Sequence, residues 1–296
     1  MDKFYRFQVG NFDCIAVSDG EMNYPLPGLF RDMPLEQIQQ ELAARGLPLT
    51  HFHSPYTLLF IDTGSSKVLV DTGIGKYAAG TKVAFAEVDN TRTRPGIAVE
   101  SLAQAGVSAE EIETIIITHA HPDHVGGNFD AEGRPSFPHA RYAIWQEEWD
   151  FWFSNKQTAA AGTPPHFVEM ARADLGPLEG EITLLDGDEE ILPGITAVRT
   201  PGHTPGHMAV LVESAGEQLM HISDAVLLPI HLELPGVVAH YDILPEVNLA
   251  TRQWLCDQLA EEETLIFAHH FAPFPNLGTI ENAGAGWRWR PQAVAS

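Results

Sequence analysis

A short run of isoleucines is followed at once by three histidines and an aspartate. The segment from Ile112 to Asn128 reads IETIIITHAHPDHVGGN, and its isoleucines are typical of a strand buried on both faces of a sheet. Buried imidazole and carboxylate groups need partners, so packing alone does not explain so many together. They are also the ligands that zinc and similar ions prefer. The segment therefore predicts a metal site at the end of a buried strand, with these candidate ligands: His119, His121, Asp123 and His124.

The spacing of these side chains fits two ions. In an extended segment alternate side chains point to one side, so His119 and His121 can hold one ion. Asp123 and His124 come just past the turn at Pro122 and can reach a second ion. The pair of glycines that follows lets the backbone pass close to the cluster.

Ligand-type side chains follow other predicted strands in the same way. Each of these comes directly after an apolar run: Asp71, His203, Asp224, His269 and His270. Such repetition is expected when a site lies along one edge of a sheet scaffold. Asp71 can cap its turn or orient a ligand imidazole, and the sequence leaves both roles open.

The charge balance limits the partners of the chain. Its 296 residues carry 17 Lys and Arg against 40 Asp and Glu, a formal net charge of −23. This charge repels nucleic acid and anionic lipid, so we expect a small-molecule substrate and neither a nucleic-acid nor a membrane partner. No stretch approaches the roughly 18 apolar residues of a membrane span, and the first residues do not read as a secretion signal, so we expect a cytoplasmic protein. Cys14 and Cys256 are expected to be packing residues rather than a disulfide.

Apolar periodicity predicts a chain of hairpins, single strands and helices. The expected hairpins are Phe4 to Val9 with Phe12 to Val17, Tyr56 to Asp62 with Lys67 to Asp71, Met208 to Val212 with Gln218 to Ile222, and one within Gly278 to Pro291. The expected single strands are Arg141 to Trp145, Ile182 to Leu185, Glu190 to Leu192, Ile195 to Arg199 and Thr264 to Ala268. Helices are expected over 34–44, over 96–106, around Trp149 to Phe153, and from Pro245 onward with Val247, Ala250, Trp254, Leu255 and Leu259 on one buried face. Ser108 and Glu111 form a capping box.

Two segments are expected to be irregular. Apart from its helix, 20–54 is rich in Pro and Leu, and its His51 and His53 either border a pocket or are solvated. Residues 154–166 contain an Ala-Ala-Ala-Gly run and two prolines, which predict a mobile loop. The aromatic residues of 145–153 either face the core or form a wall over the site or the surface of a homodimer.

The order of these motifs resembles the metallo-β-lactamase superfamily over nearly the whole chain. The signature is H-x-H-x-D-H at His119 to His124, then a single His in a TPGHTPGH turn, then an Asp after a strand, then a late His. The resemblance implies an α/β fold, a four-layer αβ/βα sandwich with two mixed sheets flanked by helices. It implies one domain over residues 1–296.

The resemblance also implies which residues hold metal. The implied ligands of one ion are His119, His121 and His203, and those of the other are Asp123, His124 and His270, with Asp224 bridging the two. In the family the first His of the turn is the ligand, so His207 is expected to support the fold instead. The segment HFAPFPNLG favours His270 over His269 as the last ligand.

The chemistry that the resemblance implies is that of a dinuclear metal-dependent hydrolase. A hydroxide bridging two divalent ions would attack a small ester, lactone or phosphotriester, and Asp123 would move a proton to the leaving group. Zinc is the expected metal, and manganese, iron and cobalt also accept this ligand set.

The tail and the Ser18 to Gly20 segment resemble the branch that holds quorum-quenching lactonases and methyl-parathion-hydrolase-like enzymes. Acyl-homoserine lactonases typically carry a Tyr three residues after the bridging Asp, where this chain has Leu227, so that hydrogen bond is missing or comes from elsewhere. A glyoxalase II-type thioesterase and a mononuclear iron persulfide dioxygenase remain alternatives. A non-catalytic binding protein is a third, which the complete ligand set argues against.

Overall fold

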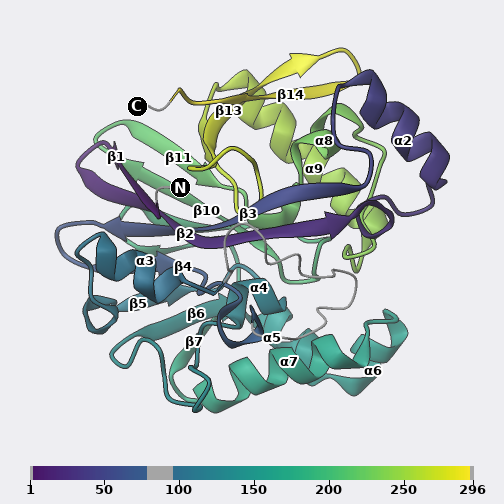
Figure 1. The fold of residues 1–296 in the computed structure, drawn as a ribbon. Coiled ribbons are helices and arrows are strands. Elements are labelled where there is room, and N and C mark those ends of the chain that lie inside the picture. The colour runs from purple at the N-terminus through teal and green to yellow at the C-terminus, as the bar shows by residue number, and fades with distance from the viewer. Residues whose placement is uncertain (1–2, 79–95, 294–296) are drawn as a thin grey trace.

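Two seven-stranded sheets form the centre of the molecule in a computed structural model that describes residues 3–78 and 96–293. The strands of each sheet lie in sequence order, from β1 to β7 in one and from β8 to β14 in the other. Apolar side chains from both sheets, among them Val68 and Val210, share one buried cluster, so the sheets pack face to face (Figure 1).

The first sheet is mixed, because β1 to β4 pair antiparallel while β4 to β7 pair parallel. Its strands are β1 Phe4–Val9, β2 Phe12–Pro25, β3 His51–Asp62, β4 Lys67–Val70, β5 Thr114–Ile116, β6 Arg141–Trp145 and β7 Ile182–Leu185. The second sheet has one parallel pair, β11 with β12. Its strands are β8 Glu189–Leu192, β9 Ile195–Arg199, β10 Met208–Ser214, β11 Glu217–His221, β12 Leu265–Phe267, β13 Leu277–Ala283 and β14 Gly286–Pro291.

Helices cover the outer face of each sheet. Apolar residues of α3 Ala98–Gln104, α5 Gln146–Phe153 and α7 Pro165–Leu175 join the core against the first sheet, and α9 Pro245–Glu261 packs on the second. The short helices are α1 Leu26–Leu29, α2 Leu35–Ala44, α4 Pro122–Val125, α6 Asn155–Ala160 and α8 Pro229–Glu233. The four-layer αβ/βα sandwich with two mixed sheets is therefore confirmed.

Most of the predicted elements are present. The four hairpins, the single strands, the capping box at Ser108 and the buried, unpaired Cys14 and Cys256 are confirmed. Phe151 and Trp152 face the core as predicted for the aromatic stripe, while Phe153 is partly exposed. Over the described ranges, no helix is long and apolar enough to cross a membrane.

The prediction that 20–54 is irregular was wrong at both ends. Strand β2 continues to Pro25 and pairs with β3 from His51, through a register shift between Ser18 and Gly20. This pairing joins segments that are distant in the chain, so local composition does not reveal it. His51 is exposed, and His53 lies 3.1 Å from the carboxylate of Glu21.

The mobile loop predicted for 154–166 is also wrong, because α6 and the start of α7 occupy most of it. The side chain of Ser154 accepts a hydrogen bond from the Gln157 N–H and caps α6. Alanine favours helix, and Pro165 stands at the first turn of α7, where its missing N–H costs nothing. The same residues that suggested a loop therefore start two helices.

The predicted buried face of α9 is confirmed at Leu255 and Leu259 and wrong at its other three positions. Val247 and Trp254 are 41% and 46% exposed, whereas Thr251 and Arg252 face inward. Thr251 donates to the Pro201 carbonyl at 2.6 Å, and Arg252 Nη1 donates to the Val237 carbonyl at 2.7 Å. The helix covers loop carbonyls that need donors, so polar residues face inward.

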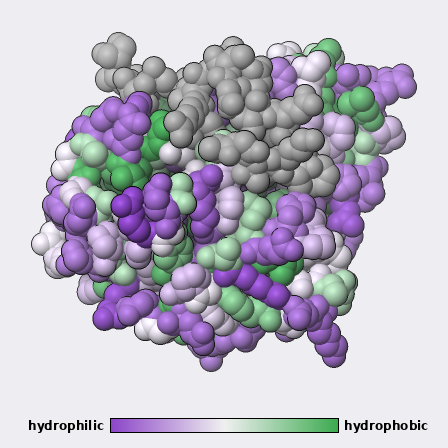
Figure 2. All heavy atoms as spheres, turned by 60° about the horizontal axis from the view of Figure 1, so that its bottom comes forward, coloured by the Kyte–Doolittle hydropathy of each residue, from purple (hydrophilic) through white to green (hydrophobic). Residues whose placement is uncertain are grey.

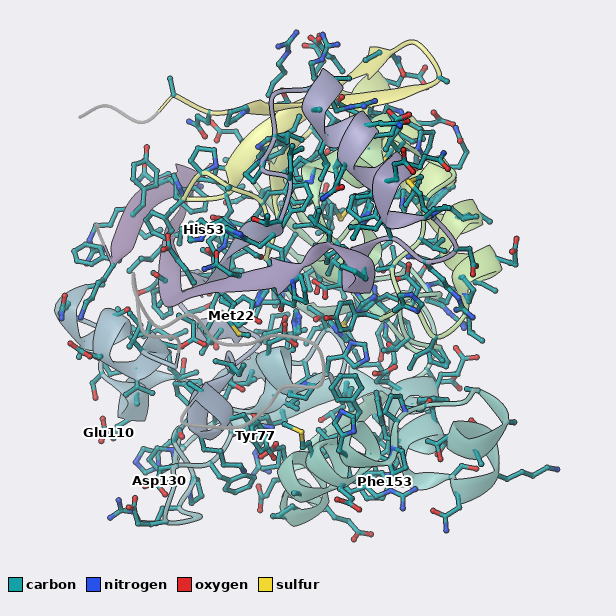
Figure 3. All side chains as sticks on the ribbon, turned by 45° about the vertical axis from the view of Figure 1, so that its right-hand side comes forward. Met22, His53, Tyr77, Glu110, Asp130 and Phe153 are labelled. Carbon is teal, nitrogen blue, oxygen red and sulfur yellow. The ribbon has the colours of Figure 1, made fainter. Side chains whose placement is uncertain are left out.

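Charged side chains lie mostly at the surface, because burying an unpaired charge is costly. Glu110 and Asp130 lie at the periphery, while Met22 lies within the fold (Figure 3). On the face shown in Figure 2, hydrophilic residues predominate among scattered hydrophobic ones.

Candidate metal centre

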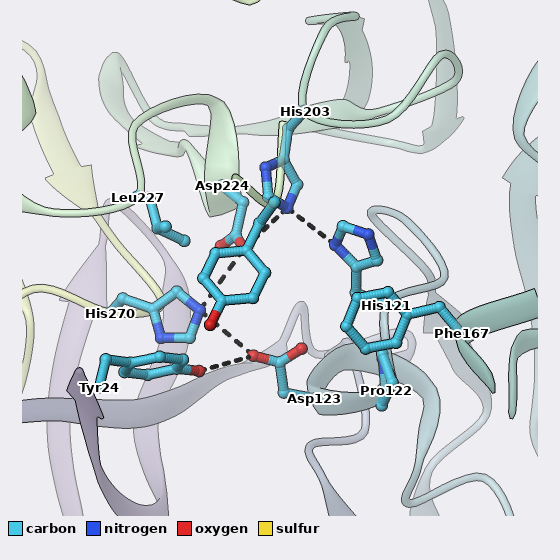
Figure 4. Close-up of a pocket in the computed structure, with 10 residues that line it drawn as sticks. Tyr24, His121, Pro122, Asp123, Phe167, His203, Asp224, Leu227 and His270 are labelled. Atoms are coloured by element: carbon cyan, nitrogen blue, oxygen red, sulfur yellow. Dashed lines mark hydrogen bonds and ion pairs between the residues drawn. The ribbon is translucent and has the colours of Figure 1, made fainter. Parts of the chain in front are cut away.

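Five strands end beside one cluster of imidazoles and carboxylates, part of which is drawn in Figure 4. The possible ligand atoms form three groups, and within each group the atoms lie within 4.8 Å of one another. The groups are His119 with His121 and His203, His119 with His124 and Asp224, and Asp123 with His124, His269 and His270. All seven residues expected to bind metal are thus brought together. Both sheets contribute to the cluster, because β4, β5, β9, β11 and β12 each end beside it.

A single oxygen of Asp224 lies at the centre of the cluster. Its Oδ2 is 3.2 Å from His203 Nε2, 3.5 Å from His124 Nε2 and His270 Nε2, and 3.8 Å from His119 Nε2. Most of these distances are too long for good hydrogen bonds. Four nitrogens that face one carboxylate oxygen in this way fit ions that lie between them.

Unsatisfied nitrogen atoms provide a test of that fit. The Nε2 atoms of His119, His124 and His270 are buried and have no hydrogen-bond partner among the described residues. Buried polar atoms are nearly always paired, and a neutral imidazole nitrogen is the commonest protein ligand for zinc-like ions. The donor set therefore fits two divalent metal ions.

The opposite ring nitrogen of several of these histidines is held by a protein group. His124 Nδ1 is 2.8 Å from Asp71 Oδ2, His203 Nδ1 is 2.9 Å from Asp242 Oδ1, and His270 Nδ1 is 3.0 Å from Ser54 Oγ. Such partners fix the tautomer and direct Nε2 toward the ion. Asp71 makes contacts that fit both roles left open for it, because it holds the ring of His124 and its Oδ1 also accepts from the Thr118 N–H at 2.8 Å.

Glu148 of α5 binds the two loops that carry the histidine trio. Its Oε1 accepts from the Ala120 N–H at 2.9 Å and from Trp152 Nε1 at 2.7 Å. Its Oε2 accepts from Thr204 Oγ1 at 2.6 Å and from the Gly206 N–H at 3.0 Å. Ala120 lies between two of the histidines and Thr204 follows the third, so one buried carboxylate fixes their relative position.

Sequence analysis did not identify Glu148, Asp242 or Ser54. Glu148 follows β6 but lies in an amphipathic helix, where a glutamate is expected to face water, and Asp242 lies in a loop with no apolar strand directly before it. A serine within β3 also carries no local signal. Only the tertiary structure shows that Asp242 and Ser54 contact the rings of His203 and His270, and that Glu148 binds the loops beside them.

The electrostatic environment favours neutral imidazoles for part of the cluster. Burial and the neighbouring imidazoles lower the pKa of His119 well below its usual value, and the same causes lower the pKa of His121 to about 3. Burial would raise the pKa of Asp123, but the His270 imidazole 3.4 Å away and the charge of His124 hold it below its usual value. Neutral imidazole and ionised carboxylate are the forms that bind metal.

His269 and His270 both lie in the group around Asp123, and His270 is the one that faces Asp224, with its Nε2 3.5 Å from Oδ2. His270 Nε2 lies 3.4 Å from Asp123 Oδ2, while its other nitrogen is held by Ser54. His269 stacks on His124, with ring centroids 4.2 Å apart. His207 supports the fold as expected, because its Nδ1 is 2.8 Å from Thr200 Oγ1 and its Nε2 accepts from the Asp224 N–H at 3.1 Å.

A small pocket of about 30 Å³ opens onto the cluster (Figure 4). Its walls outside the predicted ligands are Tyr24, Pro122, Phe167, Leu227 and Tyr241. The Tyr24 hydroxyl pairs with that of Tyr56 and lies 3.5 Å from Asp123 Oδ2. Burial and the neighbouring Tyr56 and Asp123 raise the pKa of Tyr24, so its hydroxyl stays protonated.

The fold and this cluster define a metal-dependent hydrolase that binds two divalent ions. The sequence model of the metallo-beta-lactamase superfamily matches residues 49–270, and the chain belongs to that superfamily.

Named relatives place the chain more closely. It is 26% identical over 224 residues to an N-acyl homoserine lactonase of Bacillus sp, over 73% of this chain and 81% of that protein. It resembles the structure of AidC, a dizinc quorum-quenching lactonase in complex with its product, with a TM-score of 0.88 and 25% identity over the whole of both chains. The crystal structure of the hydrolase AbOPH has a TM-score of 0.83 and 27% identity, over 100% of this chain and 99% of that one.

Proposed function

We propose that this enzyme is a dizinc lactonase. The observation that carries the proposal is the arrangement of Asp224, whose one oxygen faces four imidazole nitrogens at 3.2 to 3.8 Å. The N-acyl homoserine lactonases among the relatives and the dizinc lactonase AidC support the substrate class and the metal.

The ligand assignment is part of the proposal. Ligands of one ion are His119, His121 and His203, ligands of the other are Asp123, His124 and His270, and Asp224 lies between them. When bound, the ions lower the pKa of water and polarise the oxygen of the substrate carbonyl. The chain itself positions these groups, through Glu148 on one side of the cluster and Asp71 on the other.

Asp123 is the carboxylate that we assign to proton transfer. It faces the pocket, where its Oδ2 lies 3.5 Å from the Tyr24 hydroxyl. Opening a lactone ring leaves an alkoxide oxygen that must gain a proton. The ionised Asp123 carboxylate beside the reacting bond would take up the proton that the attacking water loses and pass it to that oxygen. Tyr24 stays protonated and holds the side chain of Asp123 in place.

Leu227 gives the pocket an apolar wall next to Asp224. Leu227 has no hydroxyl to donate to the substrate. The described residues that line the pocket include Tyr24 and Tyr241, whose hydroxyls can donate instead. The apolar wall is also compatible with a neutral phosphotriester, which makes that class the second candidate.

The experiment combines metal analysis of the purified protein with initial rates on an acyl-homoserine lactone, a simple δ-lactone, an aryl ester, paraoxon and S-lactoylglutathione. We expect two zinc ions per chain and lactone turnover that is lost in Asp123→Ala. His53→Gln is the matched control, because His53 lies in β3 outside the pocket and should leave the rate unchanged. One iron per chain, no hydrolysis, and oxygen uptake with glutathione persulfide would contradict the proposal.

A further inference from the structure

A second cavity, of about 330 Å³, adjoins the pocket over the metal centre. The two share three lining residues, His121, Phe167 and Tyr241. A substrate whose reacting bond lies at the metal centre can therefore extend its remaining part into this second cavity.

Two basic side chains, Arg31 and His240, line the second cavity, which we call the basic vestibule. They come from segments that are far apart in the sequence but joined by backbone hydrogen bonds. The Arg31 N–H donates to the Val238 carbonyl at 2.7 Å, and the His240 N–H donates to the Gly28 carbonyl at 3.1 Å. The backbones of the two basic residues are therefore held next to each other.

The Arg31 guanidinium is the one permanently positive group among the described residues that line the basic vestibule, in a chain that carries −23. Among its described lining residues the one acidic side chain is Asp242, which is buried and accepts hydrogen bonds from His203 Nδ1 and the Ala239 N–H. Asp32 lies 3.8 Å from Arg31, but its side chain is 89% exposed, so water screens its charge. Because Asp242 is turned to His203 and the Ala239 N–H, the Arg31 guanidinium is the charged group that can attract an anionic ligand here.

We propose that the basic vestibule binds a carboxylate on the substrate side chain, held by Arg31 and His240. This inference rests on the proposed lactonase function and names its substrate class, a lactone with an acidic side chain. The guanidinium group offers a planar pair of N–H donors that matches a carboxylate, and an imidazole N–H adds another. A purely alkyl side chain would offer neither basic group a hydrogen-bond acceptor.

The test compares two lactones that differ in one group. N-hexanoyl homoserine lactone ends in a methyl group, and its adipoyl counterpart ends in a carboxylate at the same carbon. With the metal-loaded full chain, we expect kcat/KM to be about tenfold higher for the adipoyl substrate, as one charged hydrogen bond would give. Succinoyl and suberoyl analogues scan the distance, and the preference should peak at one chain length.

Arg31→Gln should remove this preference and leave the rate on the hexanoyl lactone within about twofold. Arg45→Gln is the matched control, because Arg45 pairs with Glu41 and Glu233 outside the basic vestibule and should keep the preference. A second readout does not depend on turnover. Cyclopentylamides of adipic and hexanoic acid lack the scissile bond, and calorimetry should show tighter binding of the adipic one, weakened by salt and by Arg31→Gln.

Each outcome separates the two proposals. If neither lactone is hydrolysed, the proposed function fails, while the cyclopentylamides still report on the basic vestibule. If the hexanoyl compounds react and bind as well as the acidic ones at every chain length, the basic vestibule proposal is overturned. It is also overturned if the preference survives in Arg31→Gln combined with His240→Gln.

Discussion

Replacing Glu148 by Gln tests whether one buried carboxylate fixes the histidine trio. The amide that replaces this carboxylate keeps the most hydrogen bonds when its oxygen accepts from the Ala120 N–H and from Trp152 Nε1. Its NH₂ group then meets the Thr204 hydroxyl, which can turn and accept, and the Gly206 N–H, which cannot. One buried donor is left unpaired, which costs about 2 kcal/mol of the free energy of unfolding.

The same change should weaken one ion more than the other. Glu148 holds the loops of His119, His121 and His203 but does not contact Asp123 or His270. Loss of such a supporting hydrogen bond typically weakens metal binding about tenfold. In competition with a chromophoric chelator, Glu148→Gln should therefore bind one of its two ions more weakly than the native chain does. Urea unfolding of the same variant should measure the loss of stability.

A matched control lies on the same helix. Glu147 pairs with Arg199, and its side chain is 58% exposed, so Glu147→Gln should leave both measurements unchanged. If Glu148→Gln binds both ions with the affinity of the native chain and unfolds at the same urea concentration, the carboxylate does not hold the loops as argued.

Other substitutions test the remaining parts of the site and the fold. Asp242→Asn leaves either the Ala239 N–H or His203 Nδ1 without an acceptor, so we expect about tenfold weaker binding of one ion in the same chelator competition. Tyr24→Phe should lower kcat on the lactone with a stability loss of only about 1 kcal/mol, and an unchanged kcat would refute its role beside Asp123. Burial lowers the pKa of His231 to about 4, below its usual 6.5, so the unfolded chain takes up its proton first and stability falls as the pH drops through this range. Between pH 7 and pH 5 this group should lower the free energy of unfolding by about 2 kcal/mol. In urea unfolding at the two pH values, His231→Gln should therefore lose about 2 kcal/mol less stability than the native chain does.

The part of the site that the sequence predicts is the part with local spacing. His119, His121 and His124 follow one strand, and their separation along the chain already places them near one another. The positions after other apolar runs pointed to His203 and to the pair His269 and His270, and the resemblance to the superfamily then favoured His203 over His207 and His270 over His269. Asp242 had no such signal, because its role depends on a loop that lies beside His203 only in the folded chain.

The fold shows the same division. Short strands with alternating or apolar runs could be located, but the length of β2 and β3 depends on their pairing from Asp13 with Asp62 to Pro25 with His51. Similarly, the inward face of α9 is set by the carbonyls that it covers, such as that of Val237. Long-range partners decide both features, so neither periodicity nor composition contains them.

The two sheets must pack in one register for the metal site to form. The segment from His119 to His124 leaves the first sheet, while His203, Asp224 and His270 follow strands of the second. The Met208 N–H donates to the Thr118 carbonyl at 3.0 Å, and the Thr118 and Ser223 hydroxyls lie 2.9 Å apart, so the sheets are joined beside the ligands. Binding of ions to a site that only the native state contains stabilises that state. Metal affinity and the packing of the inner core are therefore linked, and a cavity made at Val210 between the sheets should weaken metal binding although Val210 contacts no ligand.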